Sequence, residues 1–215
     1  MAADLAYYDG ARHDALALLP ARVERVLELG CGTGATLAAL KGAGRCAWAG
    51  GIELAELPAR QAAARLDRLW QGDVETMALD LDIAPGSLDA VLCLDVLEHL
   101  RDPWAVMGRL VKLLKPGAMV VASIPNIRNH RVIGDLLLRG LWTYRPSGIM
   151  DRTHLRFFTR RTEVELVAGA GLTVSRVEPL VHLKPWTVKR LLRRLSAGRM
   201  DEFYAEQFLV VGVKP

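Results

Sequence analysis

The sequence predicts an α/β protein built on a seven-stranded sheet, mostly parallel with an antiparallel last strand, and covered by helices on both faces. Short apolar runs alternate with helix-forming segments along the chain, which is the order of a parallel sheet with crossover helices. The run 26–29 ends at a loop of alternating glycines, and the run 90–94 ends at Asp95. Continuous apolar runs of this length are typical of strands that are buried on both faces.

Five strands are expected before residue 124 and two after it. They are placed at 26–29, 45–52, the residues just before Asp73, 90–94, 118–123, 172–177 and 208–213. Helices are expected near 12–19, 35–41, 58–69, 103–114 and 162–169. The last of these begins at a capping-box pattern, Thr162-x-x-Glu165. A basic helix is expected over 185–199, where apolar residues recur at helical spacing opposite Lys and Arg.

The loop after the first strand reads Gly-Cys-Gly-Thr-Gly, from Gly30 to Gly34. Its three glycines can take positive φ and place no side chain between the backbone and a ligand. The helix-forming stretch that follows offers free backbone N–H groups at the end of the loop. Strand, glycine loop and helix together predict the nucleotide-binding corner of a doubly wound sheet.

Size and composition fit one globular domain, since the chain has 215 residues and 51% of them are hydrophobic. No apolar run is long enough to span a membrane, and no signal-peptide pattern opens the chain. Cys31, Cys46 and Cys93 form no metal-ligand pattern and are expected to be buried thiols. These features lead us to expect a cytoplasmic protein.

The spacing G-x-G-x-G after the acidic Glu28 resembles motif I of the class I S-adenosylmethionine-dependent methyltransferases, whose sheet is Rossmann-like. The stretch D-V-L-E-H-L from Asp95 and the turn L-K-P-G extend the resemblance. The run D-R-T-H-L-R-F-F-T from Asp151 resembles a bacterial subgroup described as methyltransferase-domain or methionine-biosynthesis-like proteins, often linked to surface-glycan assembly. The resemblance implies S-adenosylmethionine as cofactor and one methyltransferase domain over 1–215. It also implies an acceptor-covering insertion at 124–160 and a basic helical insertion at 179–205.

A cofactor site is then expected at the carboxyl ends of the strands. Glu53 would accept hydrogen bonds from both ribose hydroxyls, Asp73 would contact the adenine amino group, and Tyr8 would pack on the methionine end. The resemblance assigns cofactor binding to Tyr8, Glu28, Gly30, Cys31, Gly32, Gly34, Glu53, Leu54, Asp73, Val74, Leu94 and Asp95.

Three residues are expected at the catalytic centre. His154 and His99 would orient or deprotonate the acceptor, because imidazole exchanges a proton near neutral pH, and Arg156 would bind the acceptor. No metal is assigned, but one alternative stays open. Asp95, Glu98, His99 and His154 resemble the acid-x-x-Glu-His…His set with which some RNA and quinone-precursor O-methyltransferases hold a divalent ion.

Charge is distributed unevenly along the chain. The formal net charge is −4 over 1–120 and +8 over 121–215. The segment 124–159 carries only two acids and six arginines, namely Arg128, Arg131, Arg139, Arg145, Arg152 and Arg156. This balance predicts a small anionic acceptor, such as a sugar, nucleotide-sugar or glycan intermediate that is methylated on oxygen. No nucleic-acid partner is expected, because no such binding module is recognisable, and the basic helix could contact an anionic membrane surface.

Two other functions stay open from the sequence. A nicotinamide-dependent oxidoreductase could use the same strand, loop and helix, although its fingerprint places the third glycine one residue later. A non-catalytic domain could also bind the cofactor and serve as an assembly partner, since no residue has an obligatory catalytic role.

Overall fold

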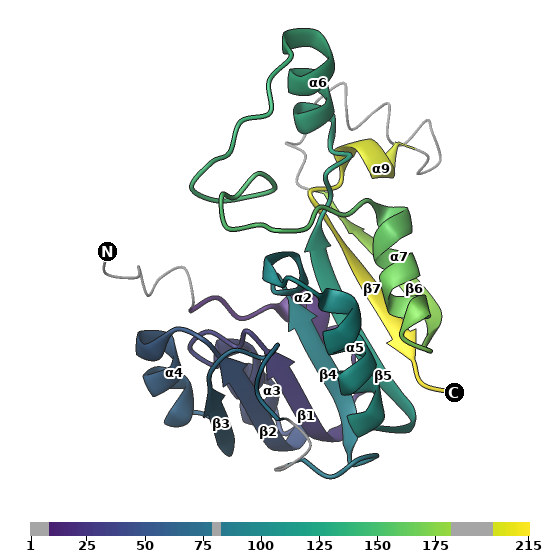
Figure 1. Cartoon of the computed structure of the whole chain (residues 1–215). Helices are drawn as coiled ribbons and strands as arrows, with labels where there is room; N and C mark the ends of the chain where they lie inside the picture. Colours follow the sequence, from purple (N-terminus) through teal and green to yellow (C-terminus); the bar gives the residue numbers. More distant parts are fainter. Residues whose placement is uncertain (1–8, 79–82, 182–199) are drawn as a thin grey trace.

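The computed structural model describes residues 9–78, 83–181 and 200–215. Within these residues, seven strands form one sheet in the order β3-β2-β1-β4-β5-β7-β6 (Figure 1). The strands are β1 Val23–Leu29, β2 Cys46–Glu53, β3 Arg68–Gln71, β4 Leu88–Leu94, β5 Leu114–Pro125, β6 Thr173–Leu180 and β7 Gln207–Val213. β7 runs antiparallel to β5 and β6, whereas the other pairs are parallel. The predicted fold class is confirmed, including the antiparallel last strand.

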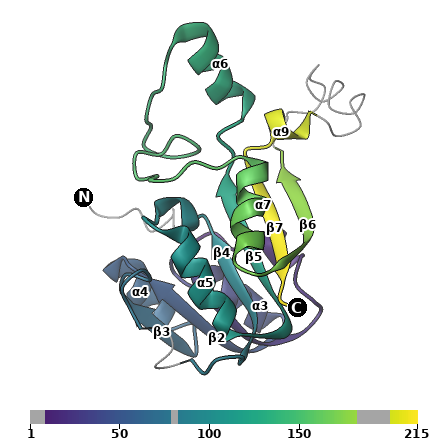
Figure 2. The same ribbon diagram turned by 45° about the vertical axis from the view of Figure 1, so that its right-hand side comes forward.

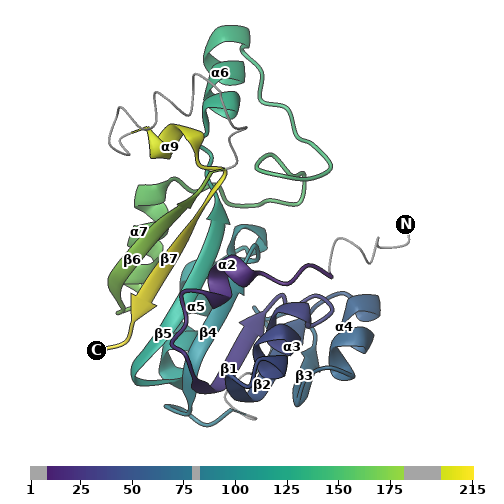
Figure 3. The same cartoon turned by 180° about the vertical axis from the view of Figure 1, so that it is seen from behind.

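Helices cover both faces of the sheet (Figures 1 and 3). On one face lie α2 His13–Leu16, α3 Ala35–Gly42 and α4 Glu56–Ala63, and on the other lie α5 Pro103–Leu113 and α7 Arg160–Gly169. The remaining helical elements stand near the carboxyl ends of the parallel strands: η2 Leu97–His99, α6 His130–Arg139 and α9 Asp201–Tyr204. No helix among the described residues is both long enough and apolar enough to cross a bilayer.

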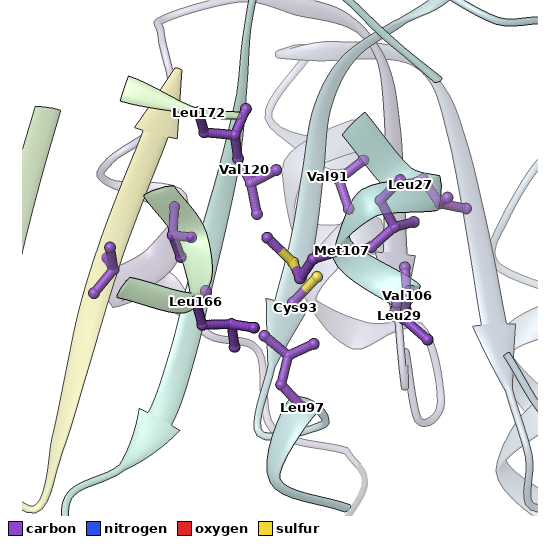
Figure 4. Close-up of a cluster of buried hydrophobic side chains, with 14 of the residues drawn as sticks. Leu27, Leu29, Val91, Cys93, Leu97, Val106, Met107, Val120, Leu166 and Leu172 are labelled. Atoms are coloured by element: carbon purple, nitrogen blue, oxygen red, sulfur yellow. The ribbon is translucent and has the colours of Figure 1, made fainter. Parts of the chain in front are cut away.

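The core lies on both sides of the central strands. On the α5 and α7 face, Leu27, Val91 and Val120 of the sheet pack against Met107 of α5 and Leu166 of α7 (Figure 4). The three cysteines are free and buried, as expected, and burial raises the pKa of their thiols. The central strands are therefore fixed by packing on both faces, which makes the loops at their ends well-supported positions for a site.

Several element boundaries differ from the sequence-based expectation. The helix expected over 58–69 is α4, which ends at Ala63. The capping box of α7 uses Thr159 and Thr162, three residues earlier than predicted. α6 was not predicted at all. The basic helix expected over 185–199, which makes up most of the insertion at 179–205, lies outside the described residues.

The strand order places the site. The chain moves outward from β1 to β2 and β3, and then returns to add β4 on the other side of β1. The carboxyl ends of β1 and β4 therefore mark the topological switch point, where open α/β sheets bind their ligands. The glycine loop follows β1 and Asp95 follows β4.

Candidate active site

The glycine loop joins β1 to α3 at the switch point. Gly30, Gly32 and Gly34 have φ of +62°, +54° and +76°, a region that residues with a Cβ rarely adopt. A Cβ added at Gly30 would lie 3.1 Å from Val96, and one at Gly34 would lie 3.1 Å from Leu66. The loop therefore requires glycine both for its conformation and for its close packing.

Glu53 ends β2 beside this loop, and its side chain is buried. Oε2 accepts a hydrogen bond from the Gly32 N–H at 2.8 Å, and Oε1 accepts one from the Ala55 N–H at 2.8 Å. Each carboxylate oxygen has two lone pairs, so both can accept a second bond from a ligand hydroxyl. Glu53 thus braces the glycine loop and still has acceptor capacity for a ribose.

Glu28 lies beneath the loop, near the end of β1, and is also buried. Burial raises the pKa of its carboxyl to about 8, while Thr36 and the Arg12 charge act in the opposite direction. Its Oε2 has no hydrogen-bond partner. A buried oxygen without a partner costs free energy unless a ligand or a proton satisfies it, and a ligand ammonium group would do so.

Arg12, just before α2, was not predicted as a site residue. Its guanidinium crosses the carboxyl ends of the strands, pairs with Asp14 at 3.0 Å and with Asp95, and donates to Ser123 Oγ at 3.1 Å. One signal could have identified it, because Arg12 is the only Lys or Arg among the first 21 residues. Its charge also acts on the buried carboxyl of Glu28.

Asp95 follows β4 with a strained backbone. Its φ of 54° is the only positive φ of a non-glycine residue in the described part of the chain, and such strain often marks functional sites. The Asp95 carboxylate accepts hydrogen bonds from Arg12 and from the Gln207 side chain of β7. Its N–H donates to the Ser123 carbonyl at 3.0 Å. Three segments that are distant in the sequence therefore converge on Asp95.

Glu98, His99 and His154 form a cluster next to Asp95. Each residue offers one ligand atom, and these atoms lie within 4.8 Å of one another. Glu98 is 1% exposed, and neither carboxylate oxygen has a hydrogen-bond partner. Its Oε1 lies 3.9 Å from His154 Nε2. The chain holds η2 against the segment around His154 through bonds from the Leu155 and Arg156 N–H groups to the Glu98 carbonyl, at 2.8 and 3.0 Å.

Both imidazoles are oriented by backbone carbonyls. His99 Nδ1 lies 3.3 Å from the Thr153 carbonyl, and His154 Nδ1 lies 3.1 Å from the Ile149 carbonyl. A carbonyl accepts only from a protonated Nδ1, so in the neutral form of each ring this geometry leaves the free lone pair on Nε2. Burial and the neighbouring His99 lower the pKa of His154. Each ring can therefore act as a proton acceptor or as a metal ligand.

Glu163 of α7 is a second buried acid behind this cluster, and the sequence analysis did not identify it. It is 1% exposed, and its Oε1 has no partner. Burial raises the pKa of its carboxyl well above 4.5, and the charges of Glu98 and Asp95 raise it further. The proton is therefore held in the folded protein at pH values where the unfolded chain releases it.

Replacing Glu163 by glutamine should stabilise the protein at pH 8 by roughly 1–3 kcal/mol, because the neutral amide does not have to take up a proton on folding as the buried carboxyl does. For the parent, stability is highest below the unfolded pKa of about 4.5 and falls as pH rises toward the raised folded pKa. The advantage of E163Q should therefore shrink toward pH 4, as measured by thermal unfolding across pH. Glu165→Gln, an exposed position on the same helix, is the control and should change little. A destabilised E163Q at pH 8 would show that Glu163 works as a charged carboxylate.

The other predicted cofactor residues differ in their exposure and in their contacts. Val74 and Leu94 are buried, whereas the Leu54 side chain is 69% exposed after β2. Asp73 accepts a hydrogen bond from the Glu75 N–H at 2.8 Å and so forms a turn. Cys31 is buried, and its Sγ lies 2.5 Å from where a Cβ at Gly51 would be, so its thiol packs against β2. Tyr8 lies outside the described residues.

The arginines of 124–160 do not gather at the histidines. Arg156 donates to the Arg101 carbonyl at 3.0 Å from Nε, and its guanidinium lies 5.9 Å from the Trp104 ring. It is thus turned toward the start of α5 and not toward the cluster. Four of the other arginines pair with surface acids: Arg128, Arg131, Arg139 and Arg145. The expected acceptor role of Arg156 stays a prediction, and in this structure Nε and Nη2 both donate to the Arg101 carbonyl.

The comparison with known protein families decides the class. A family model described as a methyltransferase domain matches residues 2–177. The chain belongs to this family. The protein is therefore a methyltransferase with S-adenosylmethionine as its cofactor, and the nicotinamide-dependent and non-catalytic alternatives are set aside.

Curated relatives of the methyltransferase carry the name ubiquinone biosynthesis O-methyltransferase. The relative from Pseudomonas aeruginosa PAO1 is 34% identical over 170 residues, which are 71% of this chain and 69% of the relative. The relative from Idiomarina loihiensis is 32% identical over 165 residues, which are 74% of this chain and 65% of the relative. The alignment thus spans just under two-thirds of the Idiomarina protein.

Solved structures share the fold of the methyltransferase. A SAM-dependent methyltransferase from Archaeoglobus fulgidus aligns with a TM-score of 0.63 at 16% identity, covering 98% of this chain and 89% of its own. An S-adenosylmethionine-dependent methyltransferase from Mesorhizobium loti aligns with a TM-score of 0.64 at 18% identity, covering 96% and 100%. At these identities the likeness concerns the fold.

The glycine loop and its neighbours fit S-adenosylmethionine in this methyltransferase. The three positive-φ glycines leave the loop open to a close ligand. The unpartnered Oε2 of Glu28 suits an ammonium group, and Glu53 has free acceptor capacity. The predicted glycine loop, Glu53 and Asp95 lie together at the switch point, and Arg12 and Gln207 join them from distant parts of the sequence.

Proposed function

We propose that the methyltransferase methylates a hydroxyl of a small aromatic acceptor, which it holds at Glu98, His99 and His154. The observation that carries the proposal is the convergence of one buried carboxyl and two oriented imidazoles beside Asp95. A hydroxyl must lose its proton as it is methylated. Imidazole nitrogens with free lone pairs can accept that proton near neutral pH.

Bound S-adenosylmethionine supplies an already activated methyl group, so the chain has to bind, orient and deprotonate. We assign Glu53 to the ribose hydroxyls, Glu28 to the ammonium group and Arg12 to the carboxylate of the methionine end. The assignment of Arg12 follows from its charge and its position across the strand ends, where it already binds carboxylates.

The same cluster fits a divalent cation. A buried carboxyl without hydrogen-bond partners has to be protonated or neutralised by a cation, and both oxygens of Glu98 are in this state. Each imidazole has its Nδ1 on a carbonyl, as second-shell groups arrange for metal-ligating histidines. Glu98, His99 and His154 would hold the ion, which would make a bound hydroxyl more acidic.

Aromatic side chains favour an aromatic acceptor over a charged one. The ring centroids of Phe157 and His154 lie 6.4 Å apart, and those of Trp142 and Tyr144 lie 5.5 and 6.3 Å from the centroid of Phe157. These rings form a continuous wall from the cluster outward, and aromatic rings pack well against one another. The surface position of the arginines removes the main support for the anionic acceptor that the charge balance predicted.

The names of the curated relatives support the same proposal, because they describe O-methylation in ubiquinone biosynthesis. We transfer from these names the reaction class, O-methylation, and an acceptor of similar chemistry. The glycan-linked acceptor is the competing candidate.

The experiment offers the purified protein S-adenosylmethionine with a catechol-type acceptor, and in parallel with a nucleotide sugar. We expect S-adenosylhomocysteine and a singly methylated catechol, detected by mass spectrometry, and loss of product in His154→Ala. Methylation of the sugar nucleotide and not of the catechol would contradict the acceptor class. Full activity of His154→Ala on the catechol would contradict the assigned site.

A further inference from the structure

The segment 136–148 is a continuous run of exposed residues. It reads L-L-L-R-G-L-W-T-Y-R-P-S-G and includes the end of α6 and the following loop. Leu137 and Leu138 are 75% and 87% exposed, and Leu141, Trp142 and Tyr144 are also exposed. Such a concentration of large apolar side chains at a surface marks an interaction site.

α6 does not use these leucines for packing. None of its residues is buried, and the helix stands away from the sheet beyond the carboxyl ends of the strands (Figures 1, 2 and 3). A ten-residue helix with this much apolar surface and no buried side chain gains little from the domain itself. Its apolar surface is therefore available to something outside the described chain.

The charges of the segment point to an anionic occupant. Residues 136–148 contain Arg139 and Arg145 and no Asp or Glu. Both arginines are exposed and share a single acid, Asp135, at 3.2 and 3.8 Å. One carboxylate cannot neutralise two guanidinium groups, so the apolar surface is flanked by excess positive charge.

We propose that the segment 136–148 docks the methyltransferase on an anionic membrane surface. The leucines enter the boundary between headgroups and acyl chains, Trp142 and Tyr144 lie at headgroup level, and the two arginines contact lipid phosphates. Leucine, aromatic residues and arginine without acids are the composition of interfacial segments. A second copy of the chain fits less well, because a twofold contact of this patch with itself would bring two positively charged surfaces together.

The proposed docking segment 136–148 adjoins the candidate active site. Trp142 and Tyr144 contact Phe157, which neighbours His154, so docking would hold the wall of the site above the bilayer. The inference concerns the surface, and it stands independently of the acceptor proposed above.

The test is co-sedimentation of the full-length protein with vesicles of phosphatidylcholine alone and of phosphatidylcholine with phosphatidylglycerol. We expect binding to the anionic vesicles, weaker binding to the neutral ones, and a loss of binding at high salt. Leu138→Glu should weaken binding roughly 10-fold to 100-fold, the weight of one buried leucine. The matched control is Leu57→Glu, an exposed leucine on α4 at a distance from α6 (Figure 1), which should bind like the parent. Circular dichroism checks that both variants fold.

Quenching by brominated lipids provides a second readout. Trp142→Phe should reduce the quenching of protein fluorescence, whereas Trp104→Phe, which removes an exposed ring on α5, should not. The proposal is overturned if the parent binds neither vesicle, or if Leu138→Glu binds as the parent does. It is also overturned if Leu138→Glu only converts a dimer to a monomer in sedimentation velocity, which would identify a second copy as the occupant.

Discussion

Replacing Glu98 by glutamine is expected to lower methyl transfer by roughly 10²–10⁴-fold without a matching loss of cofactor affinity. Glutamine keeps the size and burial of the side chain, so η2 should stay in place through its backbone bonds to Leu155 and Arg156. It removes the carboxylate that lies 3.9 Å from His154 Nε2. The amide can neither accept a proton from the acceptor nor neutralise a cation.

The measurement is kcat/KM from S-adenosylhomocysteine release, with cofactor affinity from calorimetry. The control is Glu75→Gln, which alters a half-buried carboxylate that accepts hydrogen bonds from the N–H groups of Arg101 and Asp102, just before α5. Removal of divalent ions by a chelator, followed by their return, separates the two roles of the cluster. Recovery only with the ion, together with loss of bound ion in E98Q, assigns a cation site, whereas indifference to the chelator assigns proton transfer to the histidines. An E98Q enzyme as fast as the parent would remove Glu98 from the reaction.

Replacing Glu53 by alanine is expected to weaken binding of S-adenosylhomocysteine by about 10-fold to 150-fold. This range corresponds to the roughly 1.5–3 kcal/mol of hydrogen bonds to a charged group. The variant loses the acceptor for the ribose and also the bond from the Gly32 N–H that fixes the glycine loop. Methyl transfer at saturating cofactor should fall much less, which distinguishes this variant from E98Q.

Calorimetry with S-adenosylhomocysteine measures this effect. Glu56→Ala is a matched control three residues away, because its exposed side chain pairs only with Arg60 on α4 among the interactions described. Unchanged affinity in Glu53→Ala would contradict the ribose assignment. Retained affinity in Glu53→Gln would show that one accepting oxygen on this side chain is sufficient.

Local pattern was enough to predict the sheet and the cofactor corner. The apolar runs at 26–29 and 90–94 are central strands, β1 and β4, because a strand buried on both faces needs consecutive apolar residues. Gly30, Gly32 and Gly34 take positive φ, a requirement of the turn that the residue type itself reveals. The existence of α7 was also correct, but its cap was misplaced because Thr159 and Thr162 both carry a suitable hydroxyl.

The number of charged residues was less informative, because it does not show where each charged side chain points in the folded protein. Six arginines in 124–159 predicted an anionic pocket, yet the folded chain turns Arg156 to a carbonyl and Arg139 to a neighbouring acid. An arginine on a long flexible stem takes the nearest acceptor, and that acceptor is set by tertiary structure. The exposure of α6 could not be predicted for the same reason. The sequence shows that its residues are apolar, but not whether another element of the fold covers them.

The sequence by itself determined the class of fold, the glycine loop and the identity of the acids and histidines at the strand ends. Only the tertiary structure decided which of these side chains contact one another. Arg12 and Gln207 reach Asp95 across 83 and 112 residues of sequence. Glu163 shares the buried face of α7 with Leu166 and Val167, and only the tertiary structure brings it near Glu98. Strand and turn patterns depend on neighbours within a few residues, whereas parallel strands bring the ends of distant segments to one edge of the sheet.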